Sequence, residues 1–260
     1  MKSVLKKIAV FFVPRKIRKI LAVIRQQDKA QKILMLQMKQ IVQMVTGLKF
    51  QSQSEQDMFA YFYFNGKTNG FYVDIGAHDG KSLNNTMLFE ELGWQGVCVE
   101  PQPDIFEELQ KNRSCDCYNV AVSNTSSESF EFIRAVGVNM LSGLSSQMTE
   151  AHKKRIIREN GKLEKISVKT LTFDELMGNY PERYYIDFMS IDIEGAEMSI
   201  LKAIDFAKYN FGFITVENNE EIKGHGNRLV KFMAEQGYKL YFDCGEDLMF
   251  VPKSKTSVLS

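Results

Sequence analysis

The sequence contains little cysteine and no paired metal-binding spacing. Its four cysteines, Cys98, Cys115, Cys117 and Cys244, include no CxxC pair. The single CxC at 115–117 has no second pair with which to complete a structural zinc site. We interpret the four residues as reduced thiols, which predicts a cytoplasmic protein.

A long apolar run is also missing. The most apolar stretch near the start, Ile8–Val13, is closed by Pro14 and a basic cluster, whereas a membrane-spanning helix needs about 20 apolar residues. Of the three parts of a secretory signal, only the basic start is present. We therefore expect a chain that neither spans a membrane nor is exported.

The overall charge is close to neutral, but it is divided unevenly along the chain. With 260 residues that are 44% hydrophobic, the composition is that of a globular protein and excludes disordered, collagen-like and disulfide-rich classes. Residues 1–50 carry a net charge of +11 and the remainder carries −10. This asymmetry predicts two parts, a basic arm over residues 1–50 and an acidic domain over residues 51–260.

The basic arm is predicted to be helical. Apolar residues recur at intervals of three and four from Ile17 to Leu48, with Gln27 and Gln31 interrupting the stripe. Such a helix could lie on an anionic membrane at the cytoplasmic face, form a coiled coil that dimerises the protein, or pack on the domain. Residues 1–25, where basic and apolar side chains crowd together, favour the membrane slightly. Nucleic acid is not an expected partner, because the arm lacks aromatic residues placed for base stacking.

From Tyr61 onward, short β-rich runs alternate with helical patterns, which is typical of βαβ units and a parallel sheet. Tyr238–Asp243 and Leu248–Val251 are predicted to form an antiparallel hairpin at the sheet edge. An insertion between the third and fourth parallel strands should build the substrate side of the crevice. The predicted strands are 71–75, 96–100, 118–122, 185–193 and 211–216, and the predicted helices are 81–92, 103–112, 196–206 and 228–236. The insertion holds predicted strands near 130–135 and 165–171 and a predicted helix near 147–160.

A cofactor site is predicted where the first strand ends. The run from Asp74 to Gly80 is a strand that passes into a glycine-bearing turn, and Glu100 ends the second strand, where an acid can bind ribose hydroxyls. A dinucleotide fingerprint needs a glycine where this turn has His78, and the acids of the turn would repel a pyrophosphate and attract a sulfonium cation. S-adenosylmethionine is therefore a better candidate than NAD.

At this point the sequence resembles a known family. Six strings match in order over about residues 51–220, after an upstream Ser52-Gln53…Gln56-Asp57, and together they resemble the FkbM family of S-adenosylmethionine-dependent methyltransferases. The strings are DIGAHDG at 74–80, NT at 85–86, GWQGVCVEP at 93–101, NR at 112–113, SGL at 142–144 and DIEGAE at 192–197.

The resemblance implies a class I (Rossmann-like) α/β methyltransferase fold, with a seven-stranded, mostly parallel sheet, and O-methyl transfer, commonly to sugar hydroxyls of glycans. It also implies adenine contacts from Asn119 and Ala121. With the residues already noted, the expected cofactor site comprises Asp74, Gly76, Ala77, His78, Gly80, Glu100, Pro101, Asn119, Ala121 and Asp192.

The reaction needs help in removing a proton, because a sugar hydroxyl is a poor acid. Strand-end side chains of Asp192, Glu217 and Asn218 form an oxygen set suited to Mg²⁺, similar to the metal site of the catechol-type and macrolide-sugar O-methyltransferases. Alternatively, Asp192, Glu194 or His225 acts as a base without a metal. The metal hypothesis and the base hypothesis both stay open at this stage.

We interpret the chain as an S-adenosylmethionine-dependent O-methyltransferase whose acceptor is a sugar hydroxyl of a glycan, a surface polysaccharide or a lipid-linked precursor. Two alternatives belong to other classes. One is a non-catalytic, membrane-tethered scaffold for glycan assembly that keeps the fold, and the other is an NAD-dependent sugar oxidoreductase.

Overall fold

The structure is a computed structural model, and it describes residues 33–146, 148–219, 222 and 224–254. The chain divides into two units, Met1–Phe50 and Gln51–Ser260. Residues 33–46 of the first unit are helical, and Leu34, Ile41 and Val45 of the predicted apolar stripe are exposed. Residues 1–25, for which membrane contact is expected, lie outside the described residues. Among the described residues, no helix has the length and hydropathy needed to cross a bilayer.

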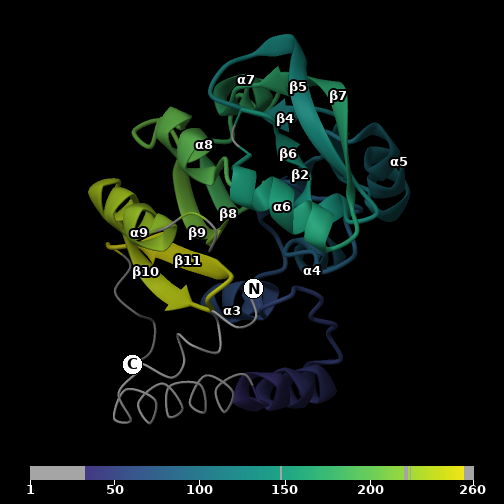
Figure 1. The fold of residues 1–260 in the computed structure, drawn as a ribbon. Coiled ribbons are helices and arrows are strands. Elements are labelled where there is room, and N and C mark those ends of the chain that lie inside the picture. Colours follow the sequence, from purple (N-terminus) through teal and green to yellow (C-terminus); the bar gives the residue numbers. More distant parts are fainter. Residues whose placement is uncertain (1–32, 147, 220–221, 223, 255–260) are drawn as a thin grey trace, which may run out of the picture. The chain divides into compact units, whose positions relative to one another are not determined.

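The second unit is built on a seven-stranded sheet in the order β10-β11-β9-β8-β1-β2-β3 (Figure 1). Only β11 runs antiparallel to its neighbours, β9 and β10. This is the class I (Rossmann-like) methyltransferase sheet, so the predicted fold, including its C-terminal antiparallel hairpin, is confirmed. The strands are β1 (Phe71–Ile75), β2 (Gln95–Val99), β3 (Asp116–Tyr118), β8 (Tyr185–Ile191), β9 (Asn210–Glu217), β10 (Tyr238–Asp243) and β11 (Asp247–Pro252).

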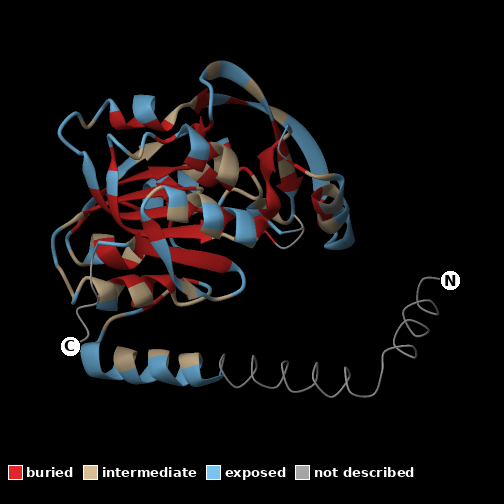
Figure 2. Cartoon of the chain, turned by 90° about the vertical axis from the view of Figure 1, so that its left-hand side faces the viewer, coloured by how far each residue is buried: buried red, intermediate tan, exposed pale blue. Residues whose placement is uncertain are grey.

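Alternate residues of β1 enter two separate cores, because successive side chains of a strand point to opposite faces. Val73 packs in a core with residues of α7, α8 and α9, whereas Tyr72 packs with Phe89 and Trp94 on the other face. All five residues of β1 are buried, as expected for a parallel strand covered on both faces. Figure 2 shows the strands as the buried interior (red) of the fold. The helices are α3 (Gln56–Tyr63), α4 (Met87–Glu91), α5 (Pro103–Asn112), α7 (Phe173–Met177), α8 (Glu197–Ala203) and α9 (His225–Glu235).

The insertion forms a second sheet, in the order β4-β7-β5-β6. Its longest pair, β5 and β7, is antiparallel and joins Phe132 to Ile166 and Val136 to Lys162. A short 3₁₀ helix, η1, and the helix α6 connect these strands. The elements are β4 (Ala121–Val122), β5 (Ser127–Val136), η1 (Asn139–Leu141), β6 (Gly143–Leu144), α6 (Glu150–Arg158) and β7 (Lys162–Leu171).

Two expected elements differ from the prediction. The helix expected over 81–92 is confined to α4, because the side chain of Asn84 accepts the backbone N–H groups of Thr86 and Met87 and keeps the chain in a turn. The strand expected over 118–122 divides into β3 and β4, which belong to different sheets. The side chain of Asn119 donates to the carbonyl oxygens of Glu100 and Pro101, and this fixes the chain between the two strands.

A buried arginine joins α5 to the first strand. Arg113, which is 6% exposed, donates to the Glu90 carboxylate at 2.6 Å and to the Tyr72 hydroxyl at 2.8 Å. It also donates to the Asn84 side-chain oxygen at 3.0 Å and to the Thr86 hydroxyl at 3.1 Å. One side chain therefore holds the loop of residues 84–86 against β1.

Arg113→Met should lower the free energy of unfolding by about 3 to 5 kcal/mol, because it leaves the Glu90 carboxylate and its neighbours without their buried charged partner. Urea unfolding followed by circular dichroism measures this. Lys202→Met, at an exposed position of α8, is the control and should change the free energy by less than about 0.5 kcal/mol. Equal unfolding midpoints for the two variants would contradict the structural role of Arg113.

Candidate functional site

A cleft of about 890 Å³ lies at the carboxyl ends of the central strands. β2 and β8 flank β1, so the chain order reverses there, which is where open α/β sheets bind ligands. The volume is at the upper end of the range for ligand pockets. The insertion closes the opposite wall with residues 138–144 and with Arg155, Arg158 and Glu159. The cleft thus has a sheet side and an insertion side, as the sequence predicted.

The turn after β1 forms the floor of the cleft, and its first glycine is required. Gly76 has φ +87°, and a Cβ atom there would lie 1.8 Å from the backbone oxygen of Asp192. The N–H groups of Gly76 and Ala77 both donate to the carbonyl of Val99. Gly76, Ala77 and His78 all line the cleft, the last with φ +50°. The backbone of β1 is therefore brought directly against the end of β8.

Asp74 precedes this turn, and its side chain holds the following loop in place through hydrogen bonds. Its buried carboxylate accepts hydrogen bonds from the Asn84 side-chain amide at 2.9 Å and the Thr86 hydroxyl at 2.7 Å. Burial raises the pKa of Asp74, and the nearby Arg113 opposes that shift. Asp74 lines the cleft, and its carboxylate also fixes the loop that follows the turn.

Glu100 occupies the end of β2, as expected of a ribose ligand. It is 4% exposed and accepts the backbone N–H groups of His78 at 3.2 Å and Gln102 at 2.9 Å. Burial raises the pKa of Glu100 to about 7, against the opposing effect of these hydrogen bonds. Glu100, Pro101 and Ala121 all line the cleft. A ligand hydroxyl group reaching Glu100 would meet a carboxylate already held in place.

Two of the expected cofactor residues lie outside the cleft lining. Gly80 packs against Leu109 and Arg113, where a Cβ atom would come within 2.6 Å of both side chains. The side chain of Asn119 is turned to the backbone of Glu100 and Pro101. The structure therefore gives Gly80 a packing role, and Asn119 acts on the site through the turn that carries Glu100.

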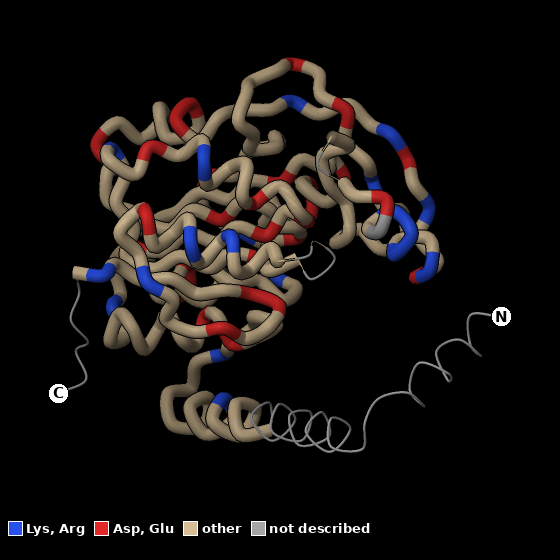
Figure 3. Tube along the Cα trace, turned by 60° about the vertical axis from the view of Figure 1, so that its left-hand side comes forward, with Lys and Arg blue, Asp and Glu red and all other residues tan. Residues whose placement is uncertain are grey.

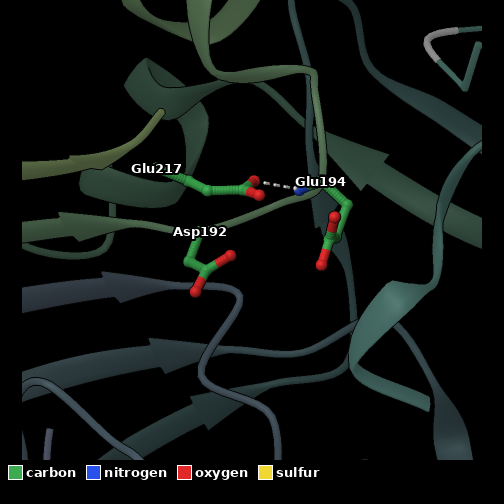
Figure 4. Close-up of side chains that lie close together, drawn as sticks. All are labelled: Asp192, Glu194 and Glu217. Carbon is green, nitrogen blue, oxygen red and sulfur yellow. Dashed lines mark hydrogen bonds between the residues drawn. The ribbon is translucent and has the colours of Figure 1, made fainter. Parts of the chain in front are cut away.

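Three carboxylates meet at the ends of β8 and β9. Asp192, Glu194 and Glu217 each place an oxygen atom within 4.8 Å of the others, and Figure 4 shows the three side chains around a common space. The backbone N–H of Glu194, a residue with φ +58°, donates to the Glu217 carboxylate at 3.0 Å. Burial raises the pKa values of Asp192 and Glu217 well above the ordinary range, and repulsion adds to the shift, from Asp247 and Glu194 for Asp192 and from Asp192 and Glu194 for Glu217. Such a set attracts cations, and its oxygen ligands are those that Mg²⁺ prefers.

Asn218, the third predicted metal ligand, also lines the cleft. Its side-chain NH₂ group donates to the carbonyl of Gly245 at 3.0 Å, and its backbone N–H donates to the carbonyl of Glu246. Glu194, predicted only as a base, joins Asp192 and Glu217 as a third close carboxylate.

His225 lies away from the cleft lining. It begins α9, is 3% exposed, and its Nε2 atom is 3.8 Å from the carboxylate of the fully buried Glu197. Burial lowers the pKa of His225, so its neutral form is favoured. Glu197 accepts the backbone N–H groups of Ile193 and Gly195 and holds the turn between them. His225, a candidate base in the sequence, is therefore buried against Glu197 and does not line the cleft.

Sequence reasoning missed several residues of the site. His152 of α6 is buried, with its Nδ1 atom 3.6 Å from the Glu194 carboxylate. Gln56 of α3 donates to the Asp247 carboxylate of β11 at 2.5 Å, and both residues line the cleft. The Ser52–Asp57 string was the only signal, and it carried no indication of its partner almost two hundred residues away. His152 had no sequence signal at all.

The sequence profile of the methyltransferase FkbM domain matches residues 74–240. No protein of curated function is detectably similar to the chain. Solved structures of similar fold include a methyltransferase from Pyrococcus furiosus, with 14% identity, 85% of this chain and 98% of that chain covered, and a TM-score of 0.36. Another is the precorrin-6y C5,15-methyltransferase from Geobacter metallireducens, with 11% identity, coverage of 75% and 84%, and a TM-score of 0.38. These likenesses are too distant to bear on substrate.

The buried acids predict an unusual dependence of stability on pH. The folded protein holds a proton on Glu100 up to about pH 7, whereas an unfolded glutamate releases it near 4.3. Between these values the folded state binds more protons, so the free energy of unfolding should fall as the pH rises, by on the order of 3 kcal/mol. Urea midpoints from pH 5 to pH 8 measure this. Glu100→Gln should flatten the profile and the exposed control Glu108→Gln should not; equal slopes in all three proteins would disprove the assignment.

Proposed function

The chain belongs to the methyltransferase FkbM family and is accordingly an S-adenosylmethionine-dependent methyltransferase, and from this premise we propose that it methylates a hydroxyl oxygen of a sugar. The acceptor would be part of a glycan, a surface polysaccharide or a lipid-linked precursor. The proposal is supported by polar side chains that line the cleft in addition to the expected cofactor residues. They include Gln53, Gln56, Arg155, Arg158, Glu159, Asn218, Asn219 and Glu246.

This lining suits a hydroxyl-rich molecule. Amide and carboxylate side chains accept and donate hydrogen bonds at defined positions, and apolar side chains of the insertion, among them Phe132, Met140 and Leu141, also line the cleft and can pack against the face of a sugar ring. The cleft is also large enough to hold a nucleoside cofactor and a second molecule together.

The cofactor would lie along the ends of β1 and β2. Glu100 would accept hydrogen bonds from the ribose hydroxyls, and the backbone around Gly76 would approach the ligand closely. The sulfonium would face the acidic strand ends, where its positive charge is stabilised by Asp192 and its neighbours. The uneven distribution of charge in the cleft therefore supports a cationic cofactor and disfavours a pyrophosphate.

Methyl transfer breaks the bond between carbon and sulfur as the acceptor oxygen forms a bond to the same carbon, and the acceptor loses its proton. Asp192 or Glu194 would take that proton. Both carboxylates line the cleft, and the raised pKa of Asp192 makes it a better proton acceptor near neutral pH than an ordinary carboxylate. The sulfur leaves as neutral S-adenosylhomocysteine.

We also propose that Asp192, Glu194 and Glu217 hold Mg²⁺. The fit is supported by three carboxylate oxygens within 4.8 Å of one another, and among the described residues neither Asp192 nor Glu217 forms an ion pair with a lysine or arginine. A divalent cation bound there would lower the pKa of an acceptor hydroxyl. In that case the three side chains would position the acceptor oxygen beside the methyl group.

Cofactor binding tests the site first. Calorimetric titration with S-adenosylhomocysteine should show binding to the wild-type protein, while NAD should not bind. Glu100→Ala should weaken the affinity by at least about tenfold, because each lost hydrogen bond to a charged group contributes about 1.5 to 3 kcal/mol. Glu108→Ala, on the exposed side of α5, should bind like wild type. Wild-type affinity in Glu100→Ala would show that the ribose does not bind there.

Magnesium binding tests the carboxylate set. After treatment with a chelator, titration of the S-adenosylhomocysteine complex with MgCl₂ should show binding that Glu217→Gln and Glu194→Gln each weaken by at least about tenfold. Glu108→Gln, on the exposed side of α5 and outside the cleft, is the control and should retain wild-type affinity. Wild-type Mg²⁺ affinity in the glutamate variants would disprove the metal site. The hypothesis that a carboxylate acts as a base without a metal would then be the one that stands.

A further inference from the structure

Two arginines of the insertion line the cleft together. Arg155 and Arg158 lie three residues apart on α6, so they are neighbours on the helix surface. Arg158 is exposed, and it has no ion pair with any residue that the structure describes. The mechanism proposed above gives these two guanidinium groups no role.

The charges in the cleft are separated. Carboxylates occupy the strand ends at Asp192 and Glu217, and the arginines occupy the opposite wall. Figure 3 shows Lys and Arg (blue) on the insertion, interspersed there with Asp and Glu (red), and further Asp and Glu at the ends of the central strands. An anionic group would be repelled from the strand ends and attracted to α6. Only one orientation of an anionic ligand is therefore favourable in this cleft.

The spacing of residues along α6 sets the distance between the carboxylates at one end of the cleft and the two arginines at the other. His152 of the same helix lies 3.6 Å from the Glu194 carboxylate. Arg155 and Arg158 follow it by three and six residues, which is about 4.5 and 9 Å along the helix axis. This is the scale of one monosaccharide unit, so a sugar with its reactive hydroxyl at the carboxylates would bring its far end to the arginines.

The carboxylate of Glu159 partly neutralises the positive charge of Arg155. The Nε atom of Arg155 donates to the Glu159 carboxylate at 3.1 Å, and Glu159 also lines the cleft. Glu159 therefore offsets part of the charge of Arg155, while Arg158, which also lines the cleft, has no such ion-pair partner among the described residues.

We propose that the acceptor sugar carries an oxyanion, a phosphate or a carboxylate, which Arg158 and Arg155 bind on the insertion side of the cleft. A guanidinium group matches both oxyanions with paired hydrogen bonds. The proposal rests on the function proposed above and narrows it to acidic acceptors such as sugar phosphates and uronic acids. Neutral sugars would lack the contact that orients them.

The test uses the full chain saturated with S-adenosylhomocysteine. Glucose 1-phosphate, glucuronate and glucose are titrated calorimetrically into wild type, Arg158→Gln, Glu159→Gln and the control Lys154→Gln, and the titrations are repeated without the cofactor. Lys154 is exposed on the same helix and does not line the cleft. Comparison of the phosphate with the carboxylate distinguishes the two oxyanions.

Wild type and Lys154→Gln should bind at least one acidic sugar about tenfold or more tightly than glucose, and Arg158→Gln should lose that preference. Glu159→Gln should strengthen it, a result that simple structural damage would not produce. Equal affinity for all three sugars in wild type, or a preference that survives in Arg158→Gln, would overturn the inference. Failure of the protein to bind S-adenosylhomocysteine would instead overturn the proposed function.

Discussion

The site depends on the parallel pairing of β1 with β8. Ile75 is opposite Ile191 in the register, so the turn after β1 meets the turn after β8 at the same level of the sheet. The contact is so close that Gly76 has no room for a Cβ atom beside the carbonyl of Asp192. Because of this approach, the expected cofactor turn and the acidic strand ends share one cleft, where methyl donor and acceptor can meet.

Electrostatic repulsion is the second constraint on the structure. The sheet brings the carboxylates of Asp192, Glu217 and Asp247 to the ends of its strands, and their pKa values are raised by burial and by neighbouring carboxylates. This arrangement costs stability in the absence of a cation, and such a cost is common at functional sites. A sulfonium, a divalent cation, or both would relieve it. The arginines of α6 stand opposite, and the cleft is thereby polarised along its length.

Local sequence patterns predicted most of the sheet, because buried parallel strands are short apolar runs bounded by glycine and acidic turns. They failed where side chains compete with the backbone. Asn84 interrupts the helix that the apolar spacing of 81–92 predicts, and Asn119 divides the strand predicted over 118–122. Asn119 could be anticipated as a residue near the cofactor but not as a support for Glu100, since its partners are the carbonyl groups of another strand.

The sequence by itself determined the class of fold, the glycine-bearing turn after β1, the acid at the end of β2 and the acids after β8, because each is a local run with its own physical reason. Tertiary structure alone decided which of those acids meet. It put Glu194 with Asp192 and Glu217, turned Asn218 to the 245–246 backbone and buried His225 against Glu197. It also brought His152, Gln56 and Arg158 to the cleft region from distant segments. Such meetings depend on strand register and on the packing of the insertion, which no short-range pattern encodes.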